Sequence, residues 1–288
     1  MDAVITYVDG NDPLWRKSFA EAVGVPAIEK RYRDWGTLVY LVRGIRRYMP
    51  FIRNIYLVVS GESQVPAWVP GSEVKVVYHR DIIPSKHLPV FNSTAIEMFL
   101  HRIPGLDGQY VYFNDDVFPV RPIREEELFR DGKSVIGFRK HLFHAGLYKQ
   151  QTRNADLLAR KALGMAPGLL FVRPQHTCTP MQKSACEEVF SKIGDELEAS
   201  VTPLREKRNV NQYVFLDYLH YSGRALKNSS ISNRHLSLAV KNADKVVNAI
   251  LHPSSSFVCI NDVKLSESRY LEMRDRILEA FEKKFGNE

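Results

Sequence analysis

The sequence predicts an α/β fold with a mostly parallel sheet, and three observations support this prediction. Short apolar runs typical of buried strands alternate with amphipathic segments typical of helices along the first 120 residues. Two of these runs lead directly into acidic clusters, and the carboxyl ends of strands in open sheets are where ligand crevices form. The length of 288 residues and the hydrophobic content of 44% are sufficient for a large core.

The first half of the chain is expected to build the sheet. In the helix at residues 35–48, apolar residues recur at helical spacing, and Pro50 marks the end of the helix. The strand at residues 109–113 is rich in β-branched and aromatic residues, as buried strands are. The expected elements are strands at residues 3–8, 55–59, 74–78 and 109–113, and helices at residues 14–23, 35–48 and 93–102.

From about residue 121 the pattern changes from strands to helices. The three glutamates at residues 125–127 are expected to begin a helix, because acidic residues suit a first turn. Further helices are expected at residues 153–165, 180–192, 212–221 and 266–284, with one last strand at residues 257–260. We therefore predict a single domain over residues 1–288, in which an α/β core (residues 1–120) carries a helical elaboration (residues 121–288).

The net charge and the cysteine content limit which classes of partner and which cellular compartment are expected. The formal net charge is +7, with basic residues spread along the chain, which favours phosphates, nucleotides or an anionic membrane surface as partners. Three cysteines without CxxC spacing favour a reducing cytoplasm. Met1 leads straight into a strand, so no signal peptide is expected, and no apolar run approaches the ~18 residues of a membrane span. Any membrane association would be peripheral.

Three strand-like segments end in carboxylate or amide oxygens. Asp9 follows the first strand, Asn114, Asp115 and Asp116 follow the fourth, and Asn261 with Asp262 follow the last. If the three strands share one sheet, these groups meet at one edge, and converging hard oxygen ligands predict Mg²⁺ or a similar cation. Three independent turns are the alternative, because Asp and Asn are common in turns.

Three other positions have a functional and a plain structural interpretation. Glu97 could point a carboxylate into a site, or could form a capping box with Thr94 at the start of its helix. His176 stands in a proline-flanked loop, where it could be a general base or a surface histidine. Arg205 and Arg208 could hold phosphate oxygens, or could form a solvated charged turn.

Motifs of other enzyme classes are missing from the sequence. There is no Walker A motif and no GxGxxG after a strand, which disfavours P-loop NTPases and Rossmann dehydrogenases. The Gly-x-Ser-x-Gly elbow of serine hydrolases is also absent.

Most of the chain resembles the Stealth family of sugar-phosphate transferases, which includes bacterial capsule polymerases and the lysosomal-enzyme N-acetylglucosamine-1-phosphotransferase. Residues 4–13 (VITYVDGNDP) are similar to its first region. Residues 31–50, 88–97 and 101–116 are similar to its second region, which closes with YFNDD. The loop around His176 resembles the third region, and residues 259–262 (CIND) resemble the fourth.

The resemblance implies a nucleotide-diphospho-sugar transferase core (GT-A-like or Rossmann-like) and a set of site residues. The implied catalytic residues are Glu97, Asp115, Asp116 and His176. The implied substrate-binding residues are Asp9, Asp12, Asn92, Arg205, Asn261 and Asp262, and the implied metal ligands are Asp9 and Asp116.

The resemblance also implies a reaction and its partners. A glycan hydroxyl would attack the β-phosphorus of a nucleotide-diphosphate sugar, with UDP-N-acetylhexosamine as the expected donor and Mg²⁺ or Mn²⁺ as the expected cofactor. The acceptor would be an oligosaccharide or polysaccharide in capsule or exopolysaccharide synthesis, and no nucleic acid is expected as a partner. The enzyme would be cytoplasmic or peripheral at the inner face of the plasma membrane. The alternatives are a metal-dependent glycosyltransferase that attacks the anomeric carbon, and a non-catalytic carbohydrate- or nucleotide-binding protein.

Overall fold

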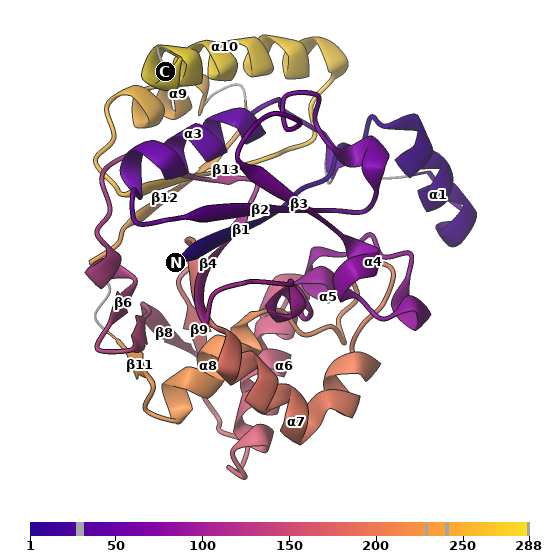
Figure 1. Ribbon diagram of the computed structural model, residues 1–288, viewed down its shortest axis with the longest axis vertical. Coiled ribbons are helices and arrows are strands. Elements are labelled where there is room, and N and C mark those ends of the chain that lie inside the picture. Colours follow the sequence, from indigo (N-terminus) through magenta and orange to yellow (C-terminus); the bar gives the residue numbers. More distant parts are fainter. Residues whose placement is uncertain (27–31, 228–229, 240–241, 287–288) are drawn as a thin grey trace.

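The computed structural model describes residues 1–26, 32–227, 230–239 and 242–286, and its centre is a five-stranded sheet (Figure 1). The strand order is β10-β4-β1-β2-β3, in which β4, β1, β2 and β3 are parallel and β10 is antiparallel to β4. The bounds are β1 Asp2–Thr6, β2 Asn54–Val59, β3 Val74–Tyr78, β4 Gln109–Asn114 and β10 Thr179–Gln182. The predicted α/β class with a mostly parallel sheet is confirmed.

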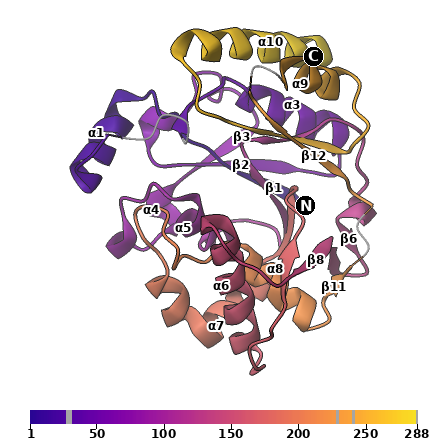
Figure 2. The same cartoon turned by 180° about the vertical axis from the view of Figure 1, so that it is seen from behind.

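Helices cover both faces of this sheet, because successive side chains of each strand point to opposite faces. In β4, Val111 and Phe113 belong to one core cluster, whereas Tyr110 and Tyr112 belong to the other. The first cluster lies under α3 (Leu38–Tyr48), α9 (Ala243–Leu251) and α10 (Glu267–Phe285). The second lies against α5 (Ser93–Glu97), α6 (Leu147–Ala162), α7 (Lys183–Ala199) and α8 (Tyr213–Tyr221). Figures 1 and 2 show these two helical layers above and below the strands.

Smaller sheets extend the structure beyond the parallel core. One contains β12 (Asn233–Ser237), β13 (Phe257–Asn261) and β5 (Val117–Pro119). Another is the two-stranded ribbon of β8 (Phe138–His141) and β9 (Phe171–Pro174). The third contains β11 (Ala225–Leu226), β7 (Lys133–Val135) and β6 (Phe129–Arg130). Strand β13 is therefore not in the sheet that carries β1 and β4, and this part of the sequence prediction is wrong.

Most predicted elements are present, with a few corrections. Helix α1 (Pro13–Val23) begins where expected, because the Asp12 side chain caps it and proline suits its first turn. Residues 180–182 lie in β10 and not in a helix, since Pro180 is tolerated in an edge strand. The predicted helix at residues 93–102 is divided into α5 and the 3₁₀ helix η3 (Leu100–Arg102). The remaining short elements are α4 (His79–Ile82) and the 3₁₀ helices η1 (Glu62–Gln64), η2 (Ser85–His87) and η4 (Glu125–Glu127).

Two further features concern the cysteines and the character of the helices. The three cysteines, Cys178, Cys186 and Cys259, are unpaired and buried. Within the described ranges, no helix combines the length and the apolar character that crossing a bilayer requires.

Candidate active site

A cavity of about 750 Å³ lies at the carboxyl ends of the parallel strands. The residues that follow these strands line it: Tyr7 after β1, Ser60 after β2, His79 after β3 and Asn114 at the end of β4. This edge of an open α/β sheet is where ligand crevices are expected. The strand ends therefore supply one wall of a binding site.

Asp115 and Asp116 form the tight turn between β4 and β5 and face this cavity. The turn is held against β13, since the Ile260 amide donates to the Asp116 carbonyl at 2.9 Å. Asp116 Oδ2 accepts a hydrogen bond from Cys259 Sγ at 3.5 Å, and Oδ1 is buried without a hydrogen-bond partner in the described part of the chain. Burial, together with the charges of Asp116 and Asp34, raises the pKa of Asp115 to about 8. Asp115 thus lies where its protonated form is favoured, and Asp116 presents a buried oxygen that a cation could bind.

The side chains around Asp116 fit a hard divalent cation. Ligand atoms of Asp116, His176 and Cys259 lie within 4.8 Å of one another. Burial and the neighbouring Asp116 raise the pKa of the Cys259 thiol far above its ordinary range, so this sulfur stays protonated and is a poor ligand. Asn261, whose Oδ1 lies 3.9 Å from Cys259 Sγ, adds an amide oxygen that also faces the cavity. Oxygen donors of this kind suit Mg²⁺ or Mn²⁺.

His176 follows β9 and lies on the cavity wall beside Asp116, as the sequence prediction required of a catalytic histidine. The Asn233 side-chain amide donates to the His176 carbonyl and anchors the loop to β12. The imidazole stacks on the ring of His235 with 5.5 Å between centroids. Burial and the adjacent His176 lower the pKa of His235. His235 was not predicted from the sequence, because no strand was expected at β12.

Glu97 also faces the cavity, and the capping-box interpretation is wrong. The N-cap of α5 is Asn92, whose side chain accepts from the Thr94 amide at 3.1 Å. Glu97 is only 4% exposed and accepts from the Gln212 amide at 3.2 Å and from the Tyr112 hydroxyl at 3.4 Å. Burial raises the pKa of Glu97. A buried carboxyl that joins α5, β4 and α8 at the cavity wall can act as a proton acceptor or donor.

Arg205 is on the same side of the cavity as Glu97. Its guanidinium donates to Ser93 Oγ, and its charge opposes the effect of burial on the pKa of Glu97. Asn92 fixes this loop to α5, because its side-chain amide donates to the Leu204 carbonyl at 3.3 Å. Arg208 is exposed, pairs with Glu206 at 2.9 Å and does not line the cavity, as expected of a solvated charged turn.

Two arginines that the sequence prediction missed form a cationic wall. Arg139 of β8 and Arg173 of β9 are directly opposite each other in the ribbon, and both line the cavity. Neither guanidinium has a hydrogen-bond or ion-pair partner among the residues that the structure describes. Like charges in directly opposed positions destabilise a strand pair, whereas an anion between them would be bound by both. Of the two, only Arg173 could have been suspected from the sequence, because it stands three residues before His176 in the proline-flanked loop.

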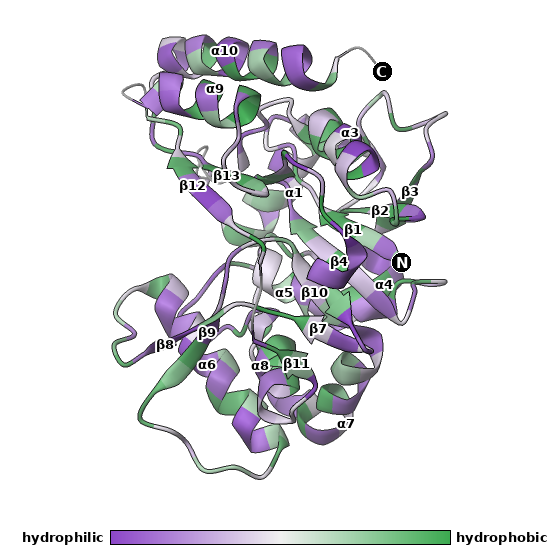
Figure 3. Cartoon of the chain, turned by 90° about the vertical axis from the view of Figure 1, so that its left-hand side faces the viewer, coloured by the Kyte–Doolittle hydropathy of each residue, from purple (hydrophilic) through white to green (hydrophobic). Residues whose placement is uncertain are grey.

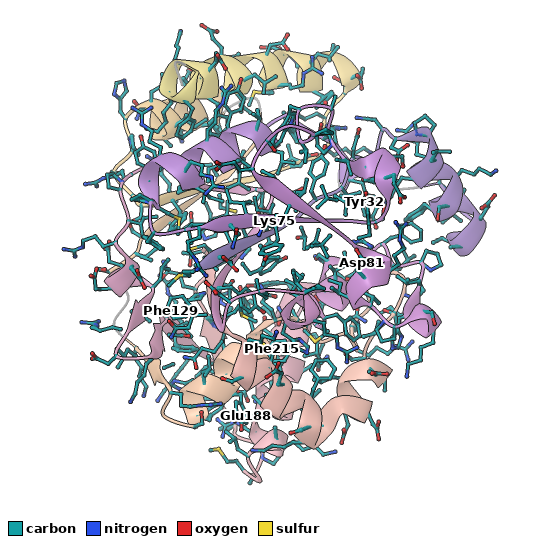
Figure 4. The ribbon with its side chains drawn as sticks, viewed as in Figure 1. Tyr32, Lys75, Asp81, Phe129, Glu188 and Phe215 are labelled. Atoms are coloured by element: carbon teal, nitrogen blue, oxygen red, sulfur yellow. The ribbon has the colours of Figure 1, made fainter. Side chains whose placement is uncertain are left out.

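One part of the cavity wall, called the aromatic end, consists of aromatic rings. Trp15, Tyr32 and Phe91 line it, with 4.8 Å between the ring centroids of Trp15 and Tyr32 and 5.5 Å between those of Trp15 and Phe91. Figure 4 labels Tyr32, which lies between α1 and the strand ends. Flat rings of this kind offer a stacking surface for a base or a sugar.

Three predicted substrate ligands lie outside this cavity: Asp9, Asp12 and Asp262. Asp12 is used as the cap of α1 and also accepts from the Gln64 side chain at 2.8 Å. Asp9 accepts from the Asn11 amide at 2.8 Å, and its own amide donates to Gln64 Oε1 at 2.8 Å, which draws the loop toward η1. Neither carboxylate lines this cavity or the smaller one that adjoins it, and the pairing of Asp9 with Asp116 around a metal stays a prediction.

A second, smaller cavity of about 220 Å³ adjoins the first, and both are lined by Tyr7, Asp115, Asp116 and Asn261. Asp262 lines only this smaller one, with its Oδ1 3.8 Å from Arg33 Nη1. Asp34 is the further acid here, and burial raises its pKa. Burial and Asp34 together raise the pKa of Tyr7 far above its ordinary value, so the phenol stays protonated and donates to Asp34. Neither Tyr7 nor Asp34 was predicted as a site residue, although both stand in the motifs that carry the resemblance.

Comparison with known proteins gives relatives across the whole chain. Conserved region 2 of Stealth proteins matches residues 31–136. A capsular polysaccharide phosphotransferase of Streptococcus pneumoniae, WcwK, is 27% identical over 323 residues, covering 99% of this chain and 96% of that protein. A capsular polysaccharide phosphotransferase of Actinobacillus suis is 36% identical over 245 residues, covering 78% of this chain and 66% of that protein.

Among solved structures, the galactosyltransferase LgtC, crystallised with donor and acceptor sugar analogues, is similar to this chain. The TM-score is 0.49 at 11% sequence identity, covering 98% of this chain and 96% of LgtC.

Proposed function

This chain belongs to the Stealth protein family, and on that premise we propose that it transfers a hexosamine-1-phosphate from a nucleotide-diphosphate sugar to a glycan hydroxyl. The product would be a phosphodiester within a capsular or exopolysaccharide chain. The relatives named as capsular polysaccharide phosphotransferases support this activity.

The charge distribution in the cavity is the observation that carries the proposal. Asp115 and Asp116 line the same cavity as Arg205 and as the opposed pair Arg139 and Arg173. Phosphoryl transfer depends on charge stabilisation and in-line positioning more than on covalent chemistry. Separate cationic walls suit a substrate that carries two phosphates, and the aromatic end suits the base of the donor.

The proposed chemistry forms one bond and breaks one bond at the β-phosphorus. The acceptor hydroxyl oxygen attacks this phosphorus while its proton passes to the His176 imidazole. The bond between the β-phosphorus and the bridging oxygen breaks, and the nucleoside monophosphate leaves with that electron pair. Arg205 and the Arg139–Arg173 pair stabilise the phosphate oxygens, and the sugar keeps its anomeric configuration because the anomeric carbon does not react.

We assign a divalent cation, Mg²⁺ or Mn²⁺, to the oxygens of Asp116 and Asn261. When bound, this cation would neutralise phosphate charge and polarise a phosphoryl oxygen. The buried Oδ1 of Asp116 supports the assignment, because a carboxylate oxygen without a partner is costly unless something binds it. We assign Asp115, on the same turn, to the neighbouring position, where it can orient the acceptor hydroxyl.

UDP-N-acetylhexosamine is the proposed donor, and a glycan of the cell surface is the proposed acceptor. Nucleotide sugars are cytoplasmic substrates, so we place the enzyme in the cytoplasm, peripheral to the inner face of the plasma membrane. The three unpaired cysteines and the formal net charge of +7 support this location.

Leaving-group identity separates the proposal from a glycosyltransferase reaction. The protein is incubated with UDP-N-acetylglucosamine, Mg²⁺ and an oligosaccharide, and the nucleotide products are measured together with the ³¹P spectrum. UMP release with a new phosphodiester signal is expected. UDP release would instead establish attack at the anomeric carbon, and donor binding without turnover would indicate a non-catalytic protein.

Asp116→Asn tests the centre of the site. The substitution removes a charge at the proposed cation and should lower kcat by at least about 100-fold, with the melting temperature near that of the native protein. Asp195→Asn is the matched control, because Asp195 is exposed on α7 and does not line the cavity. A large fall in melting temperature for Asp116→Asn would make the residue structural.

A further inference from the structure

Exposed apolar side chains are concentrated at one end of the β8–β9 ribbon. Of the nine exposed large hydrophobic side chains in the described residues, six lie between residues 142 and 170. The most exposed of these six are Phe143 at 75% and Leu169 at 82%. Single exposed apolar residues are ordinary, but a group of them on one surface indicates an interaction site.

The geometry of the ribbon brings these side chains together. His141 is paired with Phe171 at the last register position of β8 and β9, so the residues just beyond that pair leave the ribbon at the same end. Leu142 and Phe143 lead away from β8, and Leu169 and Leu170 lead into β9. Figure 3 shows both loops projecting from the same side of the chain, with hydrophobic stretches in each. We call these four residues the apolar tip.

Basic residues surround the apolar tip. Residues 139–173 contain seven lysines and arginines but a single acidic residue, Asp156. Asp156 is fully buried and paired with Arg153 and Arg160, and Lys161 pairs with Glu196 from outside the segment, so the charges of Lys140 and Lys149 near the tip are not offset by either acid. Lys140 and Lys149 flank the tip without ion-pair partners in the described ranges, and Lys207 lines a hollow together with Leu142 and Phe143. This segment supplies most of the formal net charge of the chain.

We propose that the apolar tip inserts into an anionic membrane surface while Lys140, Lys149 and Lys207 contact its lipid headgroups. Apolar side chains within a basic collar bind where anionic headgroups lie next to acyl chains. The positive charge selects this occupant over a second copy of the chain, because two such collars would repel each other.

The ribbon also connects this surface to the candidate active site. Its other end carries Arg139 and Arg173, whose side chains line the cavity. Docking at the tip would therefore place the cavity next to the membrane, within reach of a lipid-anchored glycan acceptor. This last consequence rests on the proposed function, whereas the docking itself does not.

Vesicle flotation tests the docking directly. The protein is mixed with vesicles of phosphatidylglycerol and phosphatidylcholine, or of phosphatidylcholine alone, and binding to the anionic vesicles only is expected. Phe143→Ser with Leu169→Ser should lower the partition coefficient at least about tenfold, because each side chain loses its burial in the bilayer. Lys140→Glu with Lys149→Glu should have a similar effect, and added salt should weaken binding of the native protein.

Matched controls come from exposed residues elsewhere in the chain. Leu14→Ser with Leu271→Ser removes two exposed leucines of α1 and α10, and Lys264→Glu reverses an exposed charge near α10. Both control proteins should bind anionic vesicles as the native protein does. Failure of the native protein to float, or equal binding by the tip variants and the native protein, would overturn the proposal. A native dimer that Phe143→Ser with Leu169→Ser converts to a monomer, without vesicle binding, would identify a second copy as the occupant.

Failure of docking and failure of the proposed function are distinguishable. None of Phe143, Leu169, Lys140 and Lys149 lines the large cavity, so turnover of a water-soluble acceptor should be unchanged in these variants. Vesicle binding without any UMP release would refute the transferase activity alone. UMP release from the soluble acceptor without vesicle binding would refute the docking alone.

Discussion

Replacing Asp115 by Asn should change the pH dependence of folding stability. The pKa of Asp115 is raised from 3.8 to about 8 in the folded protein, so the folded state binds this proton more tightly than the unfolded chain does. Between these two values the folded chain holds more protons, and the free energy of unfolding falls as pH rises. The contribution of protonated Asp115 is fully present below pH 4 and is lost as pH rises through about 8.

The magnitude follows from the shift and from the surroundings of the carboxyl. The whole shift corresponds to about 6 kcal/mol, because each pKa unit is worth about 1.4 kcal/mol. Asp115 is partly exposed and lines two cavities, so solvent screening should reduce the effect to about 2 kcal/mol. Asp115→Asn removes the titrating group and should recover this amount at pH 9, but little at pH 4.

The assay is urea unfolding at pH 4, 7 and 9 with EDTA present. The native protein should lose about 2 kcal/mol relative to Asp115→Asn between pH 4 and pH 9. The exposed Asp195→Asn serves as a control and should follow the native protein throughout. Addition of Mg²⁺ at pH 9 should reduce the difference in free energy of unfolding between the two proteins, since a cation can replace the proton. Parallel pH curves for the native protein and Asp115→Asn would refute the argument.

Three further outcomes are expected. Asp156→Ala should lower the free energy of unfolding by about 3–5 kcal/mol in urea titrations, because it leaves two partly buried arginines without their carboxylate partner and the Val172 amide without its acceptor; a loss below about 1 kcal/mol would contradict this. Gly44→Ala should cost about 1–3 kcal/mol, since its Cβ would lie 3.0 Å from the Pro119 carbonyl oxygen, whereas Gly108→Ala has open space and should be neutral in thermal melts. Arg173→Gln should weaken binding of UDP-N-acetylglucosamine at least about tenfold in calorimetry, whereas Lys140→Gln should bind it as the native protein does. Equal affinities of Arg173→Gln and the native protein would refute a role of the cationic wall in donor binding.

The parallel core could be predicted from the sequence because its signals are local. Each strand of β1, β2, β3 and β4 is a short apolar run, and helix α3 shows helical spacing of apolar residues. The short strands of the second half lack such runs. In β8, the sequence Phe-Arg-Lys-His has one apolar residue in four, and only its pairing with β9 makes it a strand. Pairing between distant segments leaves no local pattern to detect.

The candidate site was predictable where side chains are adjacent to strand ends. Asp115, Asp116 and His176 lie on the cavity wall as expected, and Glu97 does so against the capping interpretation. Arg139 and His235 could not be predicted, since their strands were not recognised. The position of Asp9 outside the large cavity could not be predicted either, because the hydrogen bonds that hold its loop join it to Gln64, 55 residues away in the sequence.

The candidate site combines residues from the beginning and the end of the sequence, which has a consequence for the synthesis of the protein. The large cavity is lined by Tyr7, which directly follows β1, and by Asn261 at the end of β13, and the Ile260 amide fixes the turn that carries Asp116. On a translating ribosome, the N-terminal strands emerge before β13 is synthesised. A nascent chain that stops before residue 261 therefore lacks one wall of the candidate site, and it also lacks the α10 side chains of the first core cluster. Under the proposed function, fragments left by interrupted synthesis would lack a complete site and would not consume nucleotide sugars.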